Sequence, residues 1–389
     1  MKLLSSAGED SWAVELREAT GSWKEETERS KILFGEDNSS PDEQSKRIAN
    51  QLLLDWLQSN DVYLSERSSW MEAPHPLGLS SETFDANNDN EASGRGLIAR
   101  RSINDGDCLL DIPLSLCLTK AQARRILGYN VVPTSTSEYI AIALLIIHET
   151  FVSKNESFWW PYLNILPTTE EVGPSFTWTD EELALLEGSP ALVATRSLQG
   201  KLRAEYIALT DSGGIFAKNI EMFPGVDWGP LSSPYSIQRG DMSNTYTGPF
   251  SFRNFLWAFT ILFSRAIRLD GLSGGDIVAL VPYADLINHS PFSTAYIQAK
   301  LGKKSLFGDE QDKIVVFADR TFKKMEQIFV SYGQKGNAEL LLLYGFSLDR
   351  NPFNTVEISI RLTQDKDDDP GGSLYAEKVC NVIRPLLLT

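Results

Sequence analysis

Strand-like and helical segments follow one another along this chain in blocks rather than in alternation. Short strand-like runs occur before residue 120 and again after residue 276, and residues 120–270 between them are mostly helical by apolar spacing. Proteins with a parallel α/β sheet alternate the two kinds of element, whereas separated blocks are typical of the α+β class. No GxGxxG string follows a strand-like run, which counts against a doubly wound fold. We therefore expect an α+β fold in which a helical block is inserted into a strand-rich core.

Apolar spacing and turn residues give approximate bounds for the elements. The predicted helices cover 45–58, 120–127, 137–151, 180–186, 191–209 and 252–268, and the predicted strands cover 97–99, 108–113, 277–281, 295–298, 314–318, 327–331 and 355–362. The string Asn104-Asp105-Gly106 predicts a turn, and the polar run 80–93 and the Gly/Ser/Pro-rich run 225–248 predict loops. Asn337 is expected to cap a short helix that Gly345 ends.

The overall composition is that of an ordinary soluble protein. Apolar residues make up 42% and charged residues 23% of the chain, and no apolar run reaches the ~18–20 residues that a membrane span needs. The net charge of −16 disfavours direct binding to nucleic acid, because the phosphates would be repelled. We expect no nucleic-acid partner and no membrane partner. The chain is expected to be a monomer that acts on a protein, and a lysine-rich surface would suit its charge.

Cysteine and histidine are too sparse and too scattered to suggest a metal site. The three cysteines form no CxxC pair, and three histidines cannot supply a zinc site by themselves. We expect no bound metal, and the odd cysteine count fits a reducing compartment. The N-terminus carries Glu9, Asp10 and Glu15, which fits neither a secretory signal nor an Arg-rich transit peptide. The compartment stays open among cytoplasm, nucleus and chloroplast.

Three polar strings follow apolar runs in the second half of the chain. Asp285, Asn288 and His289 lie in the string Ala284–Ser290, Tyr332-Gly333 ends a strand-like run, and Asn337–Leu341 comes next. Far upstream, Gly94–Leu97 is a turn with little side-chain bulk, and glycine lets a backbone approach a ligand closely. Each string alone is a weak signal, and a lone GxG is most often only a turn.

Together and in this order, these strings resemble the signature motifs of the SET-domain protein methyltransferases. Ser264-Arg265 resembles an "SRxF" segment, Trp160–Leu163 a "PYL" segment and Trp178–Leu183 a "WxxEEL" helix of one subclass. That subclass has a long helical insert and is typified by the Rubisco large-subunit lysine methyltransferases and the actin-histidine methyltransferases. The resemblance implies a β-rich SET core with a knotted C-terminal segment and a large helical insert.

The resemblance also implies a division of the chain. An acidic, partly disordered leader is expected over 1–43 and the SET domain over 44–350, with the insert at about 120–270. Residues 351–389 are expected to begin a truncated C-terminal substrate-binding domain.

By resemblance, the chain is an enzyme that transfers a methyl group from S-adenosylmethionine to a lysine side chain of a protein. A protein-histidine methyltransferase of the same fold is the close alternative, because pocket shape decides between the two. A non-catalytic SET scaffold and a docking module formed by the helical insert are alternatives of another class. The motif residues are all present, so the sequence gives no sign of a decayed site.

The resemblance assigns a role to each site residue. Tyr332 is the expected catalytic residue, with its hydroxyl near the methyl group and the incoming amine. Ser264, Asp285 and Tyr296 are expected to contact the substrate side chain, and Tyr344 is expected to line the same channel as Tyr296. The expected cofactor-binding residues are Gly94, Arg95, Gly96, Leu97, Arg265, Asn288, His289, Tyr344 and Phe346. Among these, Arg265 would bind the cofactor carboxylate with a forked contact.

Overall fold

The computed structural model describes residues 41–62, 64, 75–85, 91–226, 248–302 and 311–355. All of them except Thr355 fall in one compact unit, Met1–Asn354. The predicted leader up to residue 40, most of the predicted loop 225–248 and all of the predicted strand 355–362 except Thr355 lie outside the described residues.

Short strands pair into small sheets rather than into one large sheet. β1 (Leu77–Asp85) pairs antiparallel with β2 (Glu91–Ala99), with Leu79 opposite Leu97. The other strands are β3 (Cys108–Pro113), β4 (Leu118–Thr119), β5 (Ile267–Leu269), β6 (Ile277–Leu280), β7 (Asn288–His289), β8 (Gln298–Lys300), β9 (Lys313–Phe317) and β10 (Phe329–Val330). They form the orders β3-β9-β8 and β4-β6-β5, and β7 pairs with β10 in parallel. Segments far apart in the sequence are therefore neighbours.

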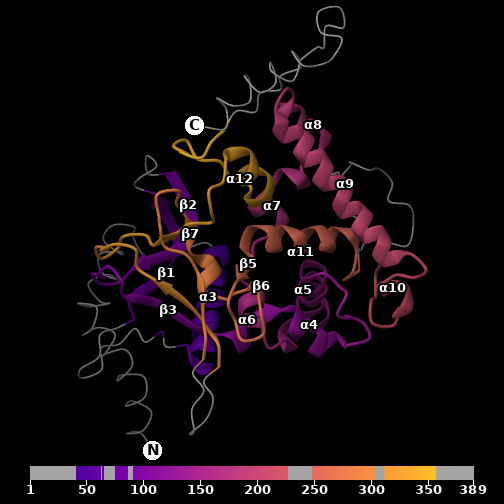
Figure 1. Ribbon diagram of the computed structural model, residues 1–389, viewed down its shortest axis with the longest axis horizontal. Helices are drawn as coiled ribbons and strands as arrows, with labels where there is room; N and C mark the ends of the chain where they lie inside the picture. The colour runs from indigo at the N-terminus through magenta and orange to yellow at the C-terminus, as the bar shows by residue number, and fades with distance from the viewer. Residues whose placement is uncertain are drawn as a thin grey trace, which may run out of the picture. The chain divides into compact units, whose positions relative to one another are not determined.

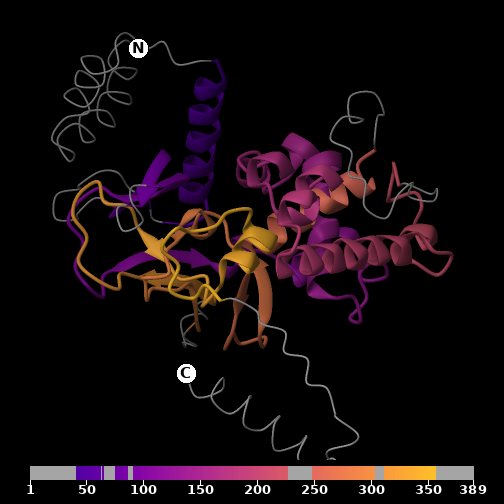
Figure 2. The same ribbon diagram turned by 90° about the horizontal axis from the view of Figure 1, so that it is seen from above.

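Most helices of the described residues lie between β4 and β5 in the sequence, whereas the first helix precedes β1 and the last follows β10. The helices of the described residues are α3 (Pro41–Ser59), α4 (Lys120–Leu127), α5 (Glu138–Ile147), α6 (Trp160–Leu163), α7 (Thr169–Val172), α8 (Asp180–Leu183), α9 (Pro190–Thr210), α10 (Ile215–Lys218), α11 (Phe252–Arg265) and α12 (Asn337–Tyr344). In Figure 1 the strands β1, β2 and β3 lie on one side, and α4, α5, α9 and α11 lie on the other. Figure 2 shows the same separation from above. The α+β fold with a helical insert is confirmed.

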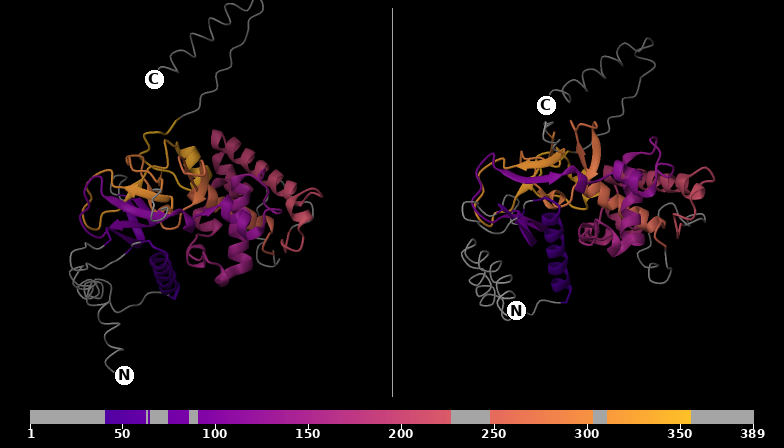
Figure 3. Two further views of the ribbon diagram at one scale, coloured as in Figure 1. Left: turned by 60° about the horizontal axis from the view of Figure 1, so that its bottom comes forward. Right: turned by 90° about the horizontal axis from the view of Figure 1, so that it is seen from below.

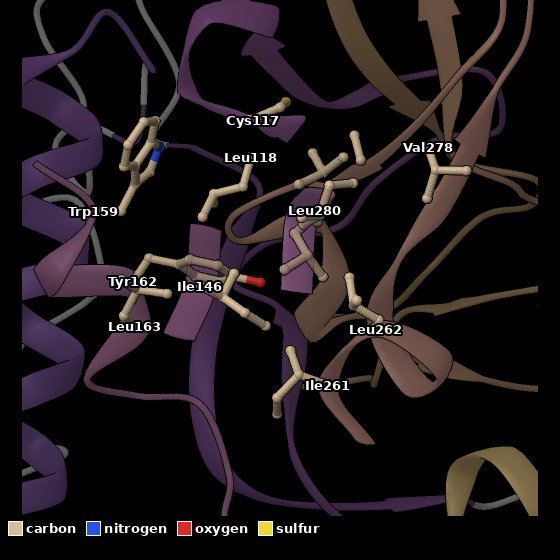
Figure 4. Packing of buried hydrophobic residues seen from close by; sticks show 14 of the residues in the cluster. Cys117, Leu118, Ile146, Trp159, Tyr162, Leu163, Ile261, Leu262, Val278 and Leu280 are labelled. Atoms are coloured by element: carbon tan, nitrogen blue, oxygen red, sulfur yellow. The ribbon is translucent and has the colours of Figure 1, made fainter. Parts of the chain in front are cut away.

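The helical side is built around α5. Every residue from Ile140 to Ile147 is buried, which fits a helix that is apolar all round and has neighbours on all sides. Ser137 caps the start of this helix by accepting a hydrogen bond from the Ile140 N–H. Figure 4 shows Ile146 beside Tyr162 and Leu163 of α6, with Ile261 and Leu262 of α11 nearby. The core therefore joins α5, α6 and α11.

The N-terminal helix α3 is buried over only part of its length. Leu53 and Leu57 are fully buried, whereas Ile48 and Leu52 are exposed. Figure 3 shows α3 with one end against the rest of the unit and the other end projecting from it. Among the described residues no helix combines the length and apolar character that crossing a membrane requires.

The structure corrects four of the predicted elements. The run 80–93 was expected to be a loop, but 80–85 belongs to β1 and 91–93 belongs to β2, because backbone pairing needs no apolar side chains on the exposed face. The helix expected over 252–268 ends at Arg265, where Ala266 turns to extended backbone and β5 begins. The strand expected at 295–298 begins only at Gln298. Asn337 is not the cap of α12; its side chain bonds instead to Leu348 and Asn351.

Candidate functional site

A pocket of about 330 Å³ opens where the helical side meets the strands. It is lined by Ser264–Arg268, Ala284–Asp285, Ile287, Tyr296–Ile297, Val330–Gly333 and Tyr344. These residues come from the end of α11 with β5, the 3-10 turn Ala284–Leu286, the segment before β8, the segment after β10, and α12. The pocket thus collects side chains from five separate parts of the chain, and we call it the Tyr332 pocket.

Tyr332 is held on both of its ring faces and at its hydroxyl. The hydroxyl donates a hydrogen bond of 2.8 Å to the carbonyl oxygen of Ile287. The ring stacks on His289 with centroids 5.0 Å apart and on Tyr344 with centroids 5.2 Å apart. Burial raises the pKa of Tyr332 to about 12, and the charge of Arg265 offsets this only in part. The hydroxyl is therefore neutral near pH 7, and its single proton is committed to Ile287.

A buried polar cluster forms one wall of the Tyr332 pocket. The Asp285 carboxylate accepts a 2.7 Å hydrogen bond from the Tyr162 hydroxyl at Oδ2, and the same oxygen lies 3.3 Å from the Arg265 guanidinium. Burial raises the pKa of Asp285 above its ordinary value, and Arg265 partly offsets that effect. Burial opposes the charge on Arg265, but the neighbouring Asp285 carboxylate raises the pKa of Arg265 overall. The two charges therefore stabilise each other in an environment that favours neither alone.

Two polar atoms of this cluster have no hydrogen-bond partner among the described residues. They are Oδ1 of Asp285 and Nε of Arg265, and both are buried. Unsatisfied buried groups are uncommon in folded proteins, and a catalytic role is one reason for them. The pair offers one free acceptor and one free donor.

Asn288 fixes the glycine-rich strand β2 beside the pocket. Its Nδ2 atom donates to the carbonyl oxygens of Ser93 and Arg95 and to the Thr83 hydroxyl. A Cβ atom at Gly96 would lie 2.6 Å from the same Nδ2 atom. Glycine is therefore required at position 96 if Asn288 is to approach the backbone this closely.

Arg95 and the other residues of Gly94–Leu97 lie close to the Tyr332 pocket. The Arg95 guanidinium donates to the Ile165 carbonyl oxygen, and burial together with the charge of Arg265 lowers the pKa of Arg95. Gly94 has a left-handed φ of 67° and open space around it. The Leu97 side chain is fully buried in the core, and its carbonyl accepts a hydrogen bond from the Ile328 N–H.

His289 contacts both the backbone and the ring of Tyr332. The Tyr332 N–H donates to Nδ1 of His289 at 3.1 Å, and the Val330 carbonyl oxygen lies 3.4 Å from the same nitrogen. Nε2 is buried without a partner among the described residues, and burial lowers the pKa of His289 to about 4. The ring is therefore neutral near pH 7 and does not present a free base to the pocket.

Of the remaining predicted site residues, Tyr296 and Ser264 line the Tyr332 pocket, whereas Phe346 adjoins it only through Tyr344. Tyr296 lines it and is 57% exposed, so it stands at the mouth. Ser264 lines the pocket while its hydroxyl donates to the Thr260 carbonyl oxygen one turn back on α11. Phe346 makes an edge contact with Tyr344, with ring centroids 6.2 Å apart. The predicted residues thus form one connected group.

Sequence reasoning missed Tyr162 and Thr83. Tyr162 is fully buried on α6, and its hydroxyl reaches Asp285 across 123 positions of sequence. The Trp160–Leu163 segment had been singled out, but a tyrosine in an apolar run usually reads as core packing. Thr83 lies in the polar run that was expected to be a loop, so no strand partner could be assigned to it.

Comparison with known proteins identifies, over more than half of the chain, the same family that the sequence motifs resemble. The SET domain family matches residues 94–333. An Arabidopsis thaliana relative, a chloroplastic [fructose-bisphosphate aldolase]-lysine N-methyltransferase, is 29% identical over 70% of this chain and 50% of its own length. A Gallus gallus relative, an actin-histidine N-methyltransferase, is 25% identical over 78% of this chain and 46% of its own length.

A solved structure agrees in fold. The crystal structure of the SET domain of LSMT bound to lysine and AdoHcy aligns with a TM-score of 0.59 and 26% identity, over 85% of this chain and 65% of that one. The chain spans about half the length of the two curated relatives. Since the family match covers more than half of the chain and includes the glycine-rich strand, Asn288, His289 and Tyr332, this chain belongs to the SET-domain family.

Proposed function

We propose that this chain is an S-adenosylmethionine-dependent protein N-methyltransferase whose substrate is a lysine side chain. The observation that carries the proposal is the Tyr332 pocket itself. A neutral tyrosine hydroxyl, two further tyrosines and the buried Asp285–Arg265 pair converge on it from separate parts of the chain. Such an arrangement suits a single side chain that must be oriented and stripped of water before it reacts.

The residues beside the pocket fit the proposed cofactor. The amino-acid part of S-adenosylmethionine carries a carboxylate, and Arg265 has a buried Nε donor without a partner among the described residues. The backbone of Gly94–Gly96, which Asn288 holds in place, offers an approach without side-chain bulk. When bound, the cofactor supplies a methyl group on a positively charged sulfur.

Tyr332 is proposed to orient the incoming amine rather than to remove its proton. Its own proton is donated to Ile287, so the lone pairs of the hydroxyl oxygen remain free to accept a hydrogen bond from the amine. Because the pKa of Tyr332 is raised to about 12, the hydroxyl does not ionise at neutral pH. Its contribution is positional and electrostatic.

Lysine suits the pocket better than histidine does. Lysine is a cation at neutral pH, with an ordinary pKa of about 10.4, whereas histidine with about 6.5 is mostly neutral. A cation is attracted by the Asp285 carboxylate and by the faces of aromatic rings such as Tyr296 and Tyr344. Histidine methylation stays the second candidate because one relative is an actin-histidine methyltransferase.

Calorimetric titration with S-adenosylmethionine tests the proposed cofactor. The wild-type chain is compared with Gly96→Ala, whose Cβ would displace Asn288, and with Gly200→Ala, whose Cβ meets nothing within 4 Å. We expect binding by the wild type and by Gly200→Ala, and a loss of at least about tenfold in Gly96→Ala, the effect of about 1.4 kcal/mol. No binding by a folded wild-type chain would refute the proposal.

The acceptor is identified in a second assay. The chain is incubated with methyl-labelled cofactor and a panel of lysine-containing peptides, alongside the same panel with histidine in place of lysine. We expect hydrolysed products to contain labelled methyl-lysine. Labelled methyl-histidine alone would replace the lysine proposal with the histidine one.

A further inference from the structure

The segment that leads into Tyr296 is held by a carboxylate that lies outside the Tyr332 pocket. We propose that Asp319 is a positioning residue, which fixes this segment so that the pocket binds the substrate lysine. Asp319 lies two residues after the end of β9 and is not among the residues that line the pocket. The inference rests on the proposed function, because it concerns how the acceptor lysine is bound.

One carboxylate oxygen of Asp319 gathers donors from three consecutive residues. Its Oδ2 atom accepts hydrogen bonds from the Ser293 hydroxyl at 2.8 Å, from the Thr294 N–H at 2.7 Å and from the Ala295 N–H at 3.0 Å. The Thr294 hydroxyl lies 3.4 Å from the same oxygen. Successive backbone N–H groups that converge in this way form a concave binding site for an anion. The segment Ser293–Ala295 is therefore folded around the carboxylate.

Ala295 connects Asp319 to the strand that leads into Tyr332. The Ala295 N–H donates to Asp319, and the Ala295 carbonyl oxygen accepts a 2.7 Å hydrogen bond from the Ser331 N–H. Both polar groups of this residue are thus engaged, one on each side. The stretches that adjoin this connection both line the pocket, namely Tyr296–Ile297 and Val330–Gly333. A displacement of Ala295 therefore changes the pocket between these two stretches.

The backbone beside Asp319 is fixed by contacts outside the pocket. The Gly106 N–H donates to the carbonyl oxygen of Ala318, and the Ala318 N–H donates to the carbonyl oxygen of Asp107, each at 2.9 Å. The preceding strand β9 lies between β3 and β8 in its sheet. The carboxylate therefore extends from a rigid part of the fold to the segment Ser293–Ala295.

The Asp319 carboxylate is ionised and holds the segment through one oxygen only. Burial opposes its charge, but the hydrogen bonds from Ser293, Thr294 and Ala295 hold the pKa of Asp319 below its ordinary value overall. The other oxygen, Oδ1, is buried without a hydrogen-bond partner among the described residues. Since every bond to the segment goes to Oδ2, a single amide oxygen at position 319 can replace it.

Tyr296 depends on its backbone for its position. Its side chain has no hydrogen bond and no ring contact among the described residues, and the residue is 57% exposed. Tyr332, by contrast, is stacked between two rings. If the segment before Tyr296 is released, the pocket is formed for only a fraction of the time, and the apparent affinity for lysine falls by the same fraction. The proposed cofactor-binding residues Arg265 and Asn288 make their contacts elsewhere.

Calorimetry on the full chain measures the two affinities separately. AdoHcy is titrated first, and L-lysine is then titrated into the chain saturated with AdoHcy. Asp319→Ala removes the acceptor, whereas Asp319→Asn keeps one oxygen. Asp312→Ala is the matched control, because Asp312 likewise accepts hydrogen bonds from a serine hydroxyl and from two backbone N–H groups, those of Ser273 and Gly302, outside the pocket.

We expect Asp319→Ala to bind L-lysine about tenfold more weakly than the wild type, as when the pocket is formed for about one tenth of the time. Its affinity for AdoHcy should equal that of the wild type. Asp319→Asn should bind L-lysine within about threefold of the wild type, because a neutral acceptor forms weaker hydrogen bonds than a charged one. Asp312→Ala should bind both ligands like the wild type.

Hydrogen–deuterium exchange without ligand reports on the segment directly. We expect the backbone amides of residues 290–297 to exchange faster in Asp319→Ala than in the wild type, because local opening is then easier. In Asp312→Ala their exchange should be unchanged. Wild-type exchange of this segment in Asp319→Ala would show that the carboxylate does not hold it, and would overturn the inference.

The calorimetric results can also overturn the inference. Wild-type lysine affinity in Asp319→Ala does so, and so does an equal loss of AdoHcy and lysine affinity, which marks a general loss of structure. An Asp319→Asn variant as weak as Asp319→Ala, or the same lysine loss in Asp312→Ala, has the same meaning. A wild-type chain that binds AdoHcy but not L-lysine overturns this inference and leaves the proposed cofactor site standing. A chain that does not bind AdoHcy refutes the proposed function, and this inference with it.

Discussion

At the scale of single residues, the hydroxyl of Tyr332 has the most clearly defined position in the site. It donates to Ile287 and is neutral, so Tyr332→Phe removes one oriented oxygen while the stacking on His289 and Tyr344 is retained. We expect kcat to fall by about 10²–10³-fold, as when one preorganised polar group is lost, with unchanged affinity for S-adenosylmethionine. Single-turnover methyl transfer measures the first quantity, and calorimetry measures the second.

The control for this substitution is Tyr129→Phe, because Tyr129 is 64% exposed and does not line the pocket. Tyr129→Phe should leave both kcat and the affinity for S-adenosylmethionine unchanged. A Tyr332→Phe variant with the turnover of the wild type would show that the hydroxyl has no part in the reaction.

Residues that lie in short motifs were predictable from the sequence, and residues that act through distant contacts were not. Tyr332, Asp285 and Arg265 were chosen by resemblance, and the structure brings all three to one pocket. Tyr162 was not chosen, because a buried tyrosine in an apolar run has no local feature that names its partner. The hydrogen bond to Asp285 exists only once α6 is packed under the pocket.

At the scale of elements, the junction between α12 and α7 allows no side chain. Gly345 ends α12 with φ 79°, and a Cβ there would collide with the carbonyl oxygen of Val172 at the end of α7. Gly271 has the same φ of 79° but nothing within 4 Å. The difference in the free energy of unfolding between Gly345→Ala and Gly271→Ala therefore measures the effect of the collision separately from that of the backbone strain.

We expect Gly271→Ala to lower the free energy of unfolding by about 1–2 kcal/mol, the cost of left-handed backbone at a residue with a Cβ. Gly345→Ala should lower it by a further ~1–3 kcal/mol, as overpacking does. Urea denaturation gives both values. Equal losses in the two variants would mean that α7 moves aside at little cost.

Helices were easier to predict than strands for a physical reason. The spacing of apolar residues alone placed the starts of α4, α5 and α11 within a residue of where the structure has them. The structure adds the caps Thr119, Ser137 and Ser251 directly before these helices. The strand β1 was missed because the polar half of a two-stranded ribbon carries no apolar alternation. The end of α11 was misplaced because Ile267–Leu269 fits helical spacing equally well, and only its pairing with β6 makes it a strand.

At the scale of the whole molecule, two buried histidines tie stability to pH. Burial lowers the pKa of both His75 and His289 to about 4, below the ordinary value of 6.5. Between these values the unfolded chain binds protons that the folded chain does not, so the stability present above pH 6.5 is lost as the pH falls toward 4. Each histidine accounts for about 1.4 kcal/mol per pH unit in that window.

Urea unfolding of the wild type and of His75→Asn at pH 7 and pH 5 checks this expectation. The variant removes His75, which lies outside the Tyr332 pocket, and keeps His289. Its free energy of unfolding should therefore fall less steeply between pH 7 and pH 5 than that of the wild type. Identical slopes for the two chains would show that His75 is not buried in its neutral form.

The distances in sequence between residues that touch have a consequence for synthesis. Asn288 bonds to Ser93 across 195 positions, and Tyr162 bonds to Asp285 across 123 positions. A chain still growing on the ribosome therefore has no site until the segment that carries Tyr332 and Tyr344 has left the exit tunnel. Folding must wait for these long-range contacts, which makes it slow, and the exposed apolar helices of the unfinished chain would need protection by chaperones in the meantime.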